Sequence, residues 1–313
     1  MPLLRLLLTA LALQLVLIRS LAAADKAPTT GDAEKTRVFI CGHSFHVFVA
    51  NQLPQVTTLA GIQAKPISGV QSLGGSQVIQ HWKLPDEKDV PAESKTGKRV
   101  AVDRLRKAIK AGEVDVLTVA PNVQLPDPGI DNYANLLLEH NPGGRLYIQA
   151  SWFPFDRPDK RGTLQNAERD GFVPAELRKL QAPFFEAMAK QARELNEKFA
   201  PQTKRQVVFV IPVGEAVLRL REKVVAGEVP GIARQSDLFT DSIGHAKAPV
   251  TMLCTYTCYA AIYGRSPVGL GVPPALKNDA DPAAAERLNG ILQQIAWDAV
   301  TNEPLTGVKI EAK

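Results

Sequence analysis

The sequence predicts an α/β fold in which a parallel sheet of five strands is covered by helices on both faces. Short apolar, β-favouring runs alternate along the chain with segments of helical apolar spacing, a pattern typical of parallel sheets. The first run, residues 38–41, is apolar at every position, as expected for a central strand buried on both faces. The chain has 313 residues, 45% hydrophobic and 22% charged, which suffices for one large domain.

Turn residues bound the five predicted strands. Gly42 ends the first run, Gly69 ends the second, and Pro121 follows the third. The strands are expected at residues 38–41, 64–70, 114–120, 145–151 and 207–213.

Helical apolar spacing marks the segments between and after these strands. The longest segment carries an apolar stripe made of Leu177, Leu180, Phe184, Met188, Ala192 and Leu195. Residues 156–171 are polar instead, and we expect them to form an exposed insertion. The helices are expected at residues 47–59, 77–82, 100–111, 130–140, 174–199, 215–226, 250–263 and 283–300.

The first 24 residues have the features of a secretory signal peptide. Arg5 precedes an apolar run over residues 6–18, and small residues at 21–24 offer a cleavage site. The run is short for a membrane span. Because Arg19 interrupts the region in an unusual place, an uncleaved anchor is the alternative.

Removal of residues 1–24 defines the expected mature protein. Residues 25–35 would be a flexible lead-in, and residues 36–313 one domain without a repeat or a linker. We expect this protein to be secreted or periplasmic, with no membrane span after signal cleavage. The removed segment holds two Arg and no acidic residue, so the net charge falls from +5 to +3. Without a long basic run, nucleic acid is not an expected partner.

The chain has only three cysteines, although export would place it in an oxidising compartment. Cys254 and Cys258 lie one turn apart on a predicted helix, where geometry does not favour a disulfide. We interpret both, together with Cys41, as small buried apolar residues. A disulfide that uses Cys41 stays open.

Ser44 lies just after the first strand, behind Gly42 and His43, at the turn into a predicted helix. Open α/β folds bind ligands at the carboxyl edge of the sheet, and the next helix directs backbone N–H groups to the same place. This position suits a nucleophile that forms and then stabilises an oxyanion. The alternative is that Ser44 caps the helix.

Further polar residues and glycines follow the later strands. They are Gly74 and Gly75 after the second strand, Asn122 after the third, and Asp241 and His245 after the fifth strand and its helix. Together with G-H-S-F at residues 42–45, this order resembles the SGNH (GDSL-like) hydrolase family, with its Ser, Gly, Asn and His blocks. The resemblance covers about residues 36–270. It implies a three-layer, flavodoxin-like sandwich.

The resemblance implies an oxyanion hole built from three donors. Ser44 matches the family's nucleophile, and its own N–H is the first donor. Gly75 matches the glycine that supplies a second N–H, with Gly74 as the alternative because two glycines fit one position. Asn122 matches the asparagine whose side-chain amide is the third donor, although Ala120 stands where the family has a glycine.

The resemblance also implies a general base. His245 matches it, and Asp241 would orient it, although three residues separate them here against two in the family. A serine hydroxyl is a weak nucleophile until an imidazole accepts its proton, and the imidazole needs an acceptor on its other nitrogen. The expected catalytic residues are therefore Ser44, His245 and Asp241.

Histidines near Ser44 raise a second interpretation. His43 and His46, in an H-x-x-H arrangement, with His81, could bind a transition metal. The spacing at a helix start is loose for chelation, so we expect no metal and no other cofactor. We expect His43 to line the pocket beside Ser44.

Aromatic side chains follow the fourth strand, at the same edge as Ser44. Trp152, Phe153 and Phe155 could stack on a sugar ring, or they could pack under residues 156–171. The combined expectation is an exported serine esterase that acts on acyl esters, with a carbohydrate O-acetyl ester favoured. The alternative is a non-catalytic SGNH-like module that binds a glycan or another ligand in the same cleft.

Overall fold

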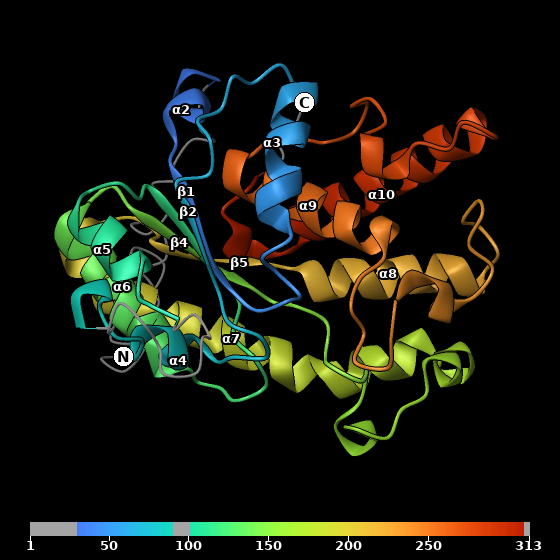
Figure 1. Ribbon diagram of the computed structural model, residues 1–313, viewed down its shortest axis with the longest axis horizontal. Coiled ribbons are helices and arrows are strands. Elements are labelled where there is room, and N and C mark those ends of the chain that lie inside the picture. The colour runs from blue at the N-terminus through green and yellow to red at the C-terminus, as the bar shows by residue number, and fades with distance from the viewer. Residues whose placement is uncertain (1–29, 90–100, 310–313) are drawn as a thin grey trace, which may run out of the picture.

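Five parallel strands form the central sheet of the computed structural model, which describes residues 30–89 and 101–309 (Figure 1). The strands lie in the order β2-β1-β3-β4-β5, which is the flavodoxin-like order. The prediction of an α/β three-layer sandwich with five parallel strands is confirmed. The strands are β1 (Val38–Gly42), β2 (Gly69–Ser72), β3 (Val116–Val119), β4 (Arg145–Gln149) and β5 (Val208–Ile211).

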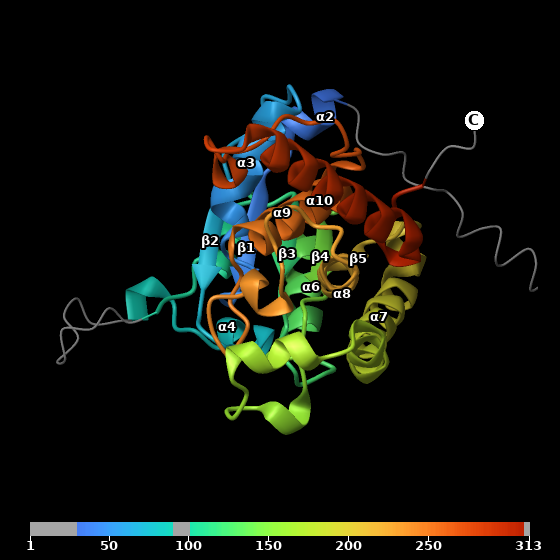
Figure 2. The ribbon, with the colours of Figure 1, turned by 90° about the vertical axis from the view of Figure 1, so that its right-hand side faces the viewer.

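Helices cover both faces of the sheet (Figures 1 and 2). One face carries α3 (Val49–Leu59), α8 (Val213–Val225), α9 (Ala248–Tyr263) and α10 (Pro282–Asn302). The other carries α4 (Val78–Trp82), α5 (Leu105–Lys110), α6 (Pro128–His140) and α7 (Pro174–Thr203). The short helix α2 (Thr30–Lys35) precedes β1.

Alternation along the strands divides the core into two halves. In β1, Val38 and Ile40 pack with the helices of the α9 side, while Phe39 and Cys41 pack with those of the α6 side. All five β1 residues are buried, which explains why the run is apolar throughout. The paired residues Ile40, Thr118 and Tyr147 lie in line across β1, β3 and β4, so these strands end at one common edge.

The second strand lies further along the chain than predicted. It begins at Gly69 rather than at residue 64, and Pro66 within the predicted run has no N–H for a sheet hydrogen bond. Gly69 is required at its position, because a Cβ there would lie 2.2 Å from the Phe39 ring. The apolar pattern alone therefore placed the strand too early.

The buried carboxylate of Asp127 links the start of α6 to the start of α4. Asp127 caps α6 by accepting the Gly129 N–H, and its carboxylate also accepts the N–H groups of Val78 and Ile79, at 2.6 and 2.9 Å. A Cβ at Gly129 would lie 2.3 Å from the Ile79 nitrogen, so only glycine permits this approach. These contacts fix the chain that follows Gly75.

Several other expectations are resolved by the structure. The three cysteines are buried and carry free thiols, as expected. Leu180, on the predicted apolar stripe of α7, is 40% exposed. Residues 30–35, expected to be a flexible lead-in, form α2 with Ala33 buried. The predicted signal peptide and residues 25–29 lie outside the described residues. Among the residues that the structure does describe, no helix has the length and apolarity that a membrane crossing requires.

Candidate active site

Ser44, His245 and Asp241 form one hydrogen-bonded chain. Ser44 Oγ lies 2.8 Å from Nε2 of His245, and Nδ1 of His245 lies 2.6 Å from Oδ2 of Asp241. Because the Asp241 carboxylate accepts the Nδ1 proton, Nε2 is left to accept the hydroxyl proton of Ser44. Ser44 does not cap the next helix, since α3 begins only at Val49 and has no side-chain cap.

The turn between Asp241 and His245 accommodates the longer spacing of this pair. The second carboxylate oxygen of Asp241 accepts the N–H groups of Gly244 and His245, at 2.9 and 3.2 Å. Gly244 has a φ of +103°, which only glycine adopts without strain. The additional residue is thus absorbed in a turn that the Asp241 side chain itself closes.

Hydrogen bonding sets the charge of Asp241. Burial alone would raise the pKa of this carboxyl group, but hydrogen bonds from the His245 imidazole and from the backbone N–H groups of His245 and Gly244 outweigh it. The pKa of Asp241 therefore lies below its usual range, and the group is ionised near neutral pH. An ionised carboxylate holds the imidazole in the tautomer that the Ser44 hydroxyl needs.

Arg169 holds the backbone of this turn. Its Nη1 donates to the carbonyl oxygen of Asp241 at 2.7 Å, and its Nη2 donates to that of Ser242 at 2.8 Å. Asp156 neutralises Arg169 through a 3.1 Å contact with Nε and also contacts Arg221 at 2.8 Å. The side chains of these three ionised residues are at most 1% exposed. The turn thus rests on a buried ion cluster, Arg169–Asp156–Arg221.

Residues 156–171 are mostly exposed, as expected, but Asp156, Leu164 and Arg169 within them are buried. Asp156 has a φ of +62°, and the preceding Phe155 has a φ of +58°, both uncommon for residues other than glycine. Such strain persists where surrounding contacts fix the backbone, and the two guanidinium groups provide those contacts. The sequence gives no signal for the cluster, because its members are scattered through polar stretches.

Trp152 also holds the turn between Asp241 and His245. It is 2% exposed, its ring stacks on Phe45 at 4.5 Å between centroids, and its Nε1 donates to the Gly244 carbonyl oxygen at 3.0 Å. The Phe155 N–H donates to the Ile243 carbonyl oxygen at 2.9 Å. Of the two alternatives left open for Trp152, the structure shows packing: it stacks on Phe45 and is not among the residues that line the pocket.

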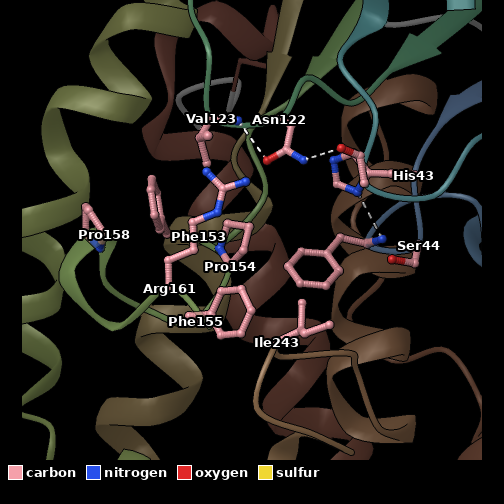
Figure 3. Close-up of a pocket in the computed structure, with 12 residues that line it drawn as sticks. His43, Ser44, Asn122, Val123, Phe153, Pro154, Phe155, Pro158, Arg161 and Ile243 are labelled. Atoms are coloured by element: carbon pink, nitrogen blue, oxygen red, sulfur yellow. Dashed lines mark hydrogen bonds between the residues drawn. The ribbon is translucent and has the colours of Figure 1, made fainter. Parts of the chain in front are cut away.

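A pocket of about 430 Å³ opens beside Ser44 (Figure 3). Phe153 and Phe155 line it, so two of the three aromatics predicted at this edge do reach the pocket. Gly75 and Asn122 line it as well, whereas Gly74 does not. The structure therefore favours Gly75 over Gly74 as the glycine at the site.

Asn122 fixes the position of Gly75. Its Nδ2 donates to the Gly75 carbonyl oxygen at 2.7 Å, and its Oδ1 accepts the Val123 N–H at 2.8 Å. Gly75 has a φ of +63°, so a side chain at this position would be strained. One of the two Nδ2 hydrogens of Asn122 is thereby used to join the loop after β3 to the loop after β2, and the second is left for a ligand.

The three histidines considered as metal ligands have separate environments. His43 lines the pocket as expected, and burial lowers its pKa. His46 is fully buried, with its ring nitrogens 2.6 Å from Gln149 Oε1 and 2.8 Å from Thr118 Oγ1. His81 is paired with a serine hydroxyl at 2.8 Å. Among the described residues, no three His, Cys, Asp or Glu side chains gather in a way that would hold a metal ion.

Comparisons with known proteins add a likeness of fold. No protein-family model matches the chain, and no curated protein matches it. A solved structure of a DUF4886 family protein from Bacteroides uniformis is similar, with a TM-score of 0.50 and 16% identity over 86% of this chain and 95% of that one. The structure of WcbI, described as a polysaccharide biosynthesis enzyme, has a TM-score of 0.32 and 11% identity over 87% and 97%. At these identities the first likeness concerns the fold alone.

Proposed function

We propose that this protein is a serine esterase of the SGNH type. The observation that carries the proposal is the continuous chain from Ser44 through His245 to Asp241, with steps of 2.8 and 2.6 Å, beside an open pocket. These distances lie within the range over which a general base takes a proton from a nucleophile. A structural serine would not require an oriented imidazole at this distance.

The residues have complementary roles in the proposed reaction. His245 Nε2 accepts the hydroxyl proton as Ser44 Oγ attacks the ester carbonyl carbon, and Asp241 stabilises the imidazolium that forms. The backbone N–H groups of Ser44 and Gly75 and the free Nδ2 hydrogen of Asn122 are the proposed donors to the oxyanion. His245 then protonates the leaving alcohol, and water activated by the same imidazole releases the acyl group from Ser44.

The proposed substrate class is an acyl ester, with a carbohydrate O-acetyl ester favoured. Phe153 and Phe155 line the pocket, where a sugar ring could pack against their aromatic side chains. Export by a signal peptide over residues 1–24, to the periplasm or the medium, is part of the proposal and would place such polysaccharide esters within reach.

Replacement of Ser44 tests the proposal directly. Ser44→Ala should lower kcat for a chromogenic acetyl ester by roughly 10⁴-fold or more, because no other oxygen occupies the nucleophile position. The circular dichroism spectrum and melting temperature should stay close to those of the wild type, since the hydroxyl lies at the surface of the pocket.

Ser266→Ala is the matched control, because Ser266 is a half-buried turn residue that does not line the pocket. It should keep wild-type turnover. Undiminished turnover in folded Ser44→Ala would refute the role of Ser44.

A non-catalytic binding module is the second candidate. The Asn122 amide is partly engaged by the Gly75 carbonyl oxygen, and Ala120 replaces the family's glycine, so the oxyanion side departs from the family pattern. A serine-reactive fluorophosphonate separates the two candidates. Labelling at Ser44 favours the esterase, whereas folded protein that resists labelling favours the binding module.

A further inference from the structure

Arg161 places an unpaired positive charge in the pocket. Its side chain lines the pocket and extends toward the other lining residues (Figure 3). Within residues 30–89 and 101–309 its guanidinium has neither a hydrogen-bond partner nor an ion pair. The neighbouring cations are different, because Arg157 pairs with Asp159 at 3.0 Å and Lys160 pairs with Glu168 at 2.7 Å.

Among the described residues that line the pocket, none carries a charge that offsets Arg161. The described residues that line the pocket include no aspartate and no glutamate. The His43 imidazole is held neutral at physiological pH, because burial lowers its pKa. The remaining walls include Phe153, Pro154 and Phe155. The pocket thus combines a nucleophile, apolar walls and one cation without a counter-ion.

The turn that carries Arg161 is fixed to the body of the protein. Leu164, three residues later, is 2% exposed, and its N–H donates to the Lys160 carbonyl oxygen at 3.1 Å. At the start of the same segment, Asp156 belongs to the buried ion cluster that holds the catalytic turn. Because both sides of the turn are anchored, little backbone order remains to be gained when a ligand binds Arg161.

A guanidinium recognises carboxylates through two parallel hydrogen bonds. We infer that the substrate of this pocket is an ester that also carries a carboxylate, which Arg161 binds while Ser44 attacks the ester carbonyl. An acylated uronic acid has this chemistry. The inference rests on the proposed esterase function, and it assigns Arg161 as the residue that selects anionic over neutral esters.

Two pairs of esters test this selection and locate the carboxylate. In the first, 4-acetoxybenzoate is compared with its neutral methyl ester, which places the charge on the alcohol part. In the second, 4-nitrophenyl hemisuccinate is compared with methyl 4-nitrophenyl succinate, which places it on the acyl part. For each pair, the measured quantity is the ratio of kcat/KM for the anionic ester to that for the neutral one, after subtraction of turnover by Ser44→Ala.

Arg161→Met should lower this ratio about tenfold in at least one pair, mainly through KM for the anionic ester. Arg157→Met is the matched control, since it removes a cation of the same loop that is already paired and does not line the pocket. It should leave the ratio at the wild-type value. Equal ratios in wild type and Arg161→Met for both pairs would overturn the inference, while Ser44-dependent turnover would leave the proposed function intact.

Binding gives a second readout that does not depend on turnover. The affinity of 4-acetoxybenzoate and of its methyl ester for Ser44→Ala, with and without Arg161→Met, is measured by ligand-observed NMR, and 4-nitrophenyl hemisuccinate and its methyl ester are treated in the same way. Weaker binding of an anionic ligand on loss of Arg161, with the neutral ligand less affected, supports the anion subsite even if no ester is hydrolysed. Unchanged binding of both anionic ligands overturns it.

Discussion

Single residues account for most of the chemistry inferred for this site. Ser44 lies two residues after the end of β1, and Asp241 both orients His245 and closes the turn that carries it. The two carboxylate oxygens of Asp241 therefore have different roles. The two roles can be separated, because the backbone N–H groups need only an acceptor oxygen, whereas the proposed role toward the imidazole needs a charged carboxylate.

Asp241→Asn separates these roles. The asparagine oxygen can still accept the N–H groups of Gly244 and His245, so the turn should fold. The amide cannot hold His245 in the required tautomer as a carboxylate does, so kcat for an acetyl ester should fall roughly 10³- to 10⁴-fold. The measurement is steady-state turnover together with thermal unfolding of the purified variant.

Asp237→Asn is the control for this change, since Asp237 precedes the same turn but pairs with Arg234 at the surface. Its turnover should equal that of the wild type. Wild-type kcat in Asp241→Asn would show that the imidazole is oriented without this carboxylate.

At the scale of elements, the segment between β4 and α7 supports the turn that carries Asp241 and His245. It supplies Trp152, Phe155 and Arg169, which together hold four consecutive carbonyl groups of residues 241–244. It also presents Arg161 to the pocket. A single insertion after one strand therefore positions the proposed general base, His245, and shapes one side of the pocket.

Asp156→Asn should weaken this support. It removes the one carboxylate shared by Arg169 and Arg221, and an uncompensated buried charge typically costs about 3–5 kcal/mol of unfolding free energy. Because Arg169 also holds the turn that carries His245, kcat should change by a larger factor than KM. Urea unfolding and steady-state kinetics measure the two effects.

Asp159→Asn provides the comparison within the same segment, because Asp159 forms a surface ion pair with Arg157. Surface pairs contribute little to stability, so this variant should unfold and turn over like the wild type. Equal behaviour of the Asp156 and Asp159 variants would contradict the supporting role of the buried cluster.

At the scale of the whole molecule, the alternation of strands and helices was sufficient to predict the parallel sheet and both helix layers. Ser44, Asn122 and His245 were predictable because each follows a strand or lies where the resemblance to a known family places its base. The start of β2 was not predicted correctly. Pro66 lacks the N–H that a sheet hydrogen bond needs, and Gly69 permits the close approach of Phe39, and neither effect appears in the apolar pattern. The roles of Arg169 and Arg161 depend on partners far away in the chain, which no local pattern contains.

The stability of the whole domain should depend on pH through His46. This imidazole bridges Thr118 of β3 and Gln149 of β4, and burial lowers its pKa to about 4, against an ordinary value near 6.5. Between these values the unfolded chain binds a proton that the folded protein excludes. The contribution of His46 is therefore complete above pH 6.5 and is lost as the pH falls toward 4, by about 3 kcal/mol in total.

Urea unfolding at pH 7 and at pH 4.5 measures this dependence. His46→Gln removes the titration of this imidazole but not that of His81, whose pKa burial also lowers to about 4, so the difference in unfolding free energy between the two pH values should shrink without vanishing. His140→Gln, at an exposed position at the end of α6, should leave the difference unchanged. A full wild-type difference in His46→Gln would exclude His46 as its source.

The three buried cysteines make the folded protein resistant to thiol alkylation. Their thiols are unlinked and fully enclosed, and burial raises the pKa of each. A thiolate-directed alkylating reagent can therefore modify only molecules that have opened. The rate of alkylation at Cys41 would report exposure of the sheet beside Ser44, whereas the rates at Cys254 and Cys258 would report release of α9. The native cysteines can therefore distinguish two kinds of local opening.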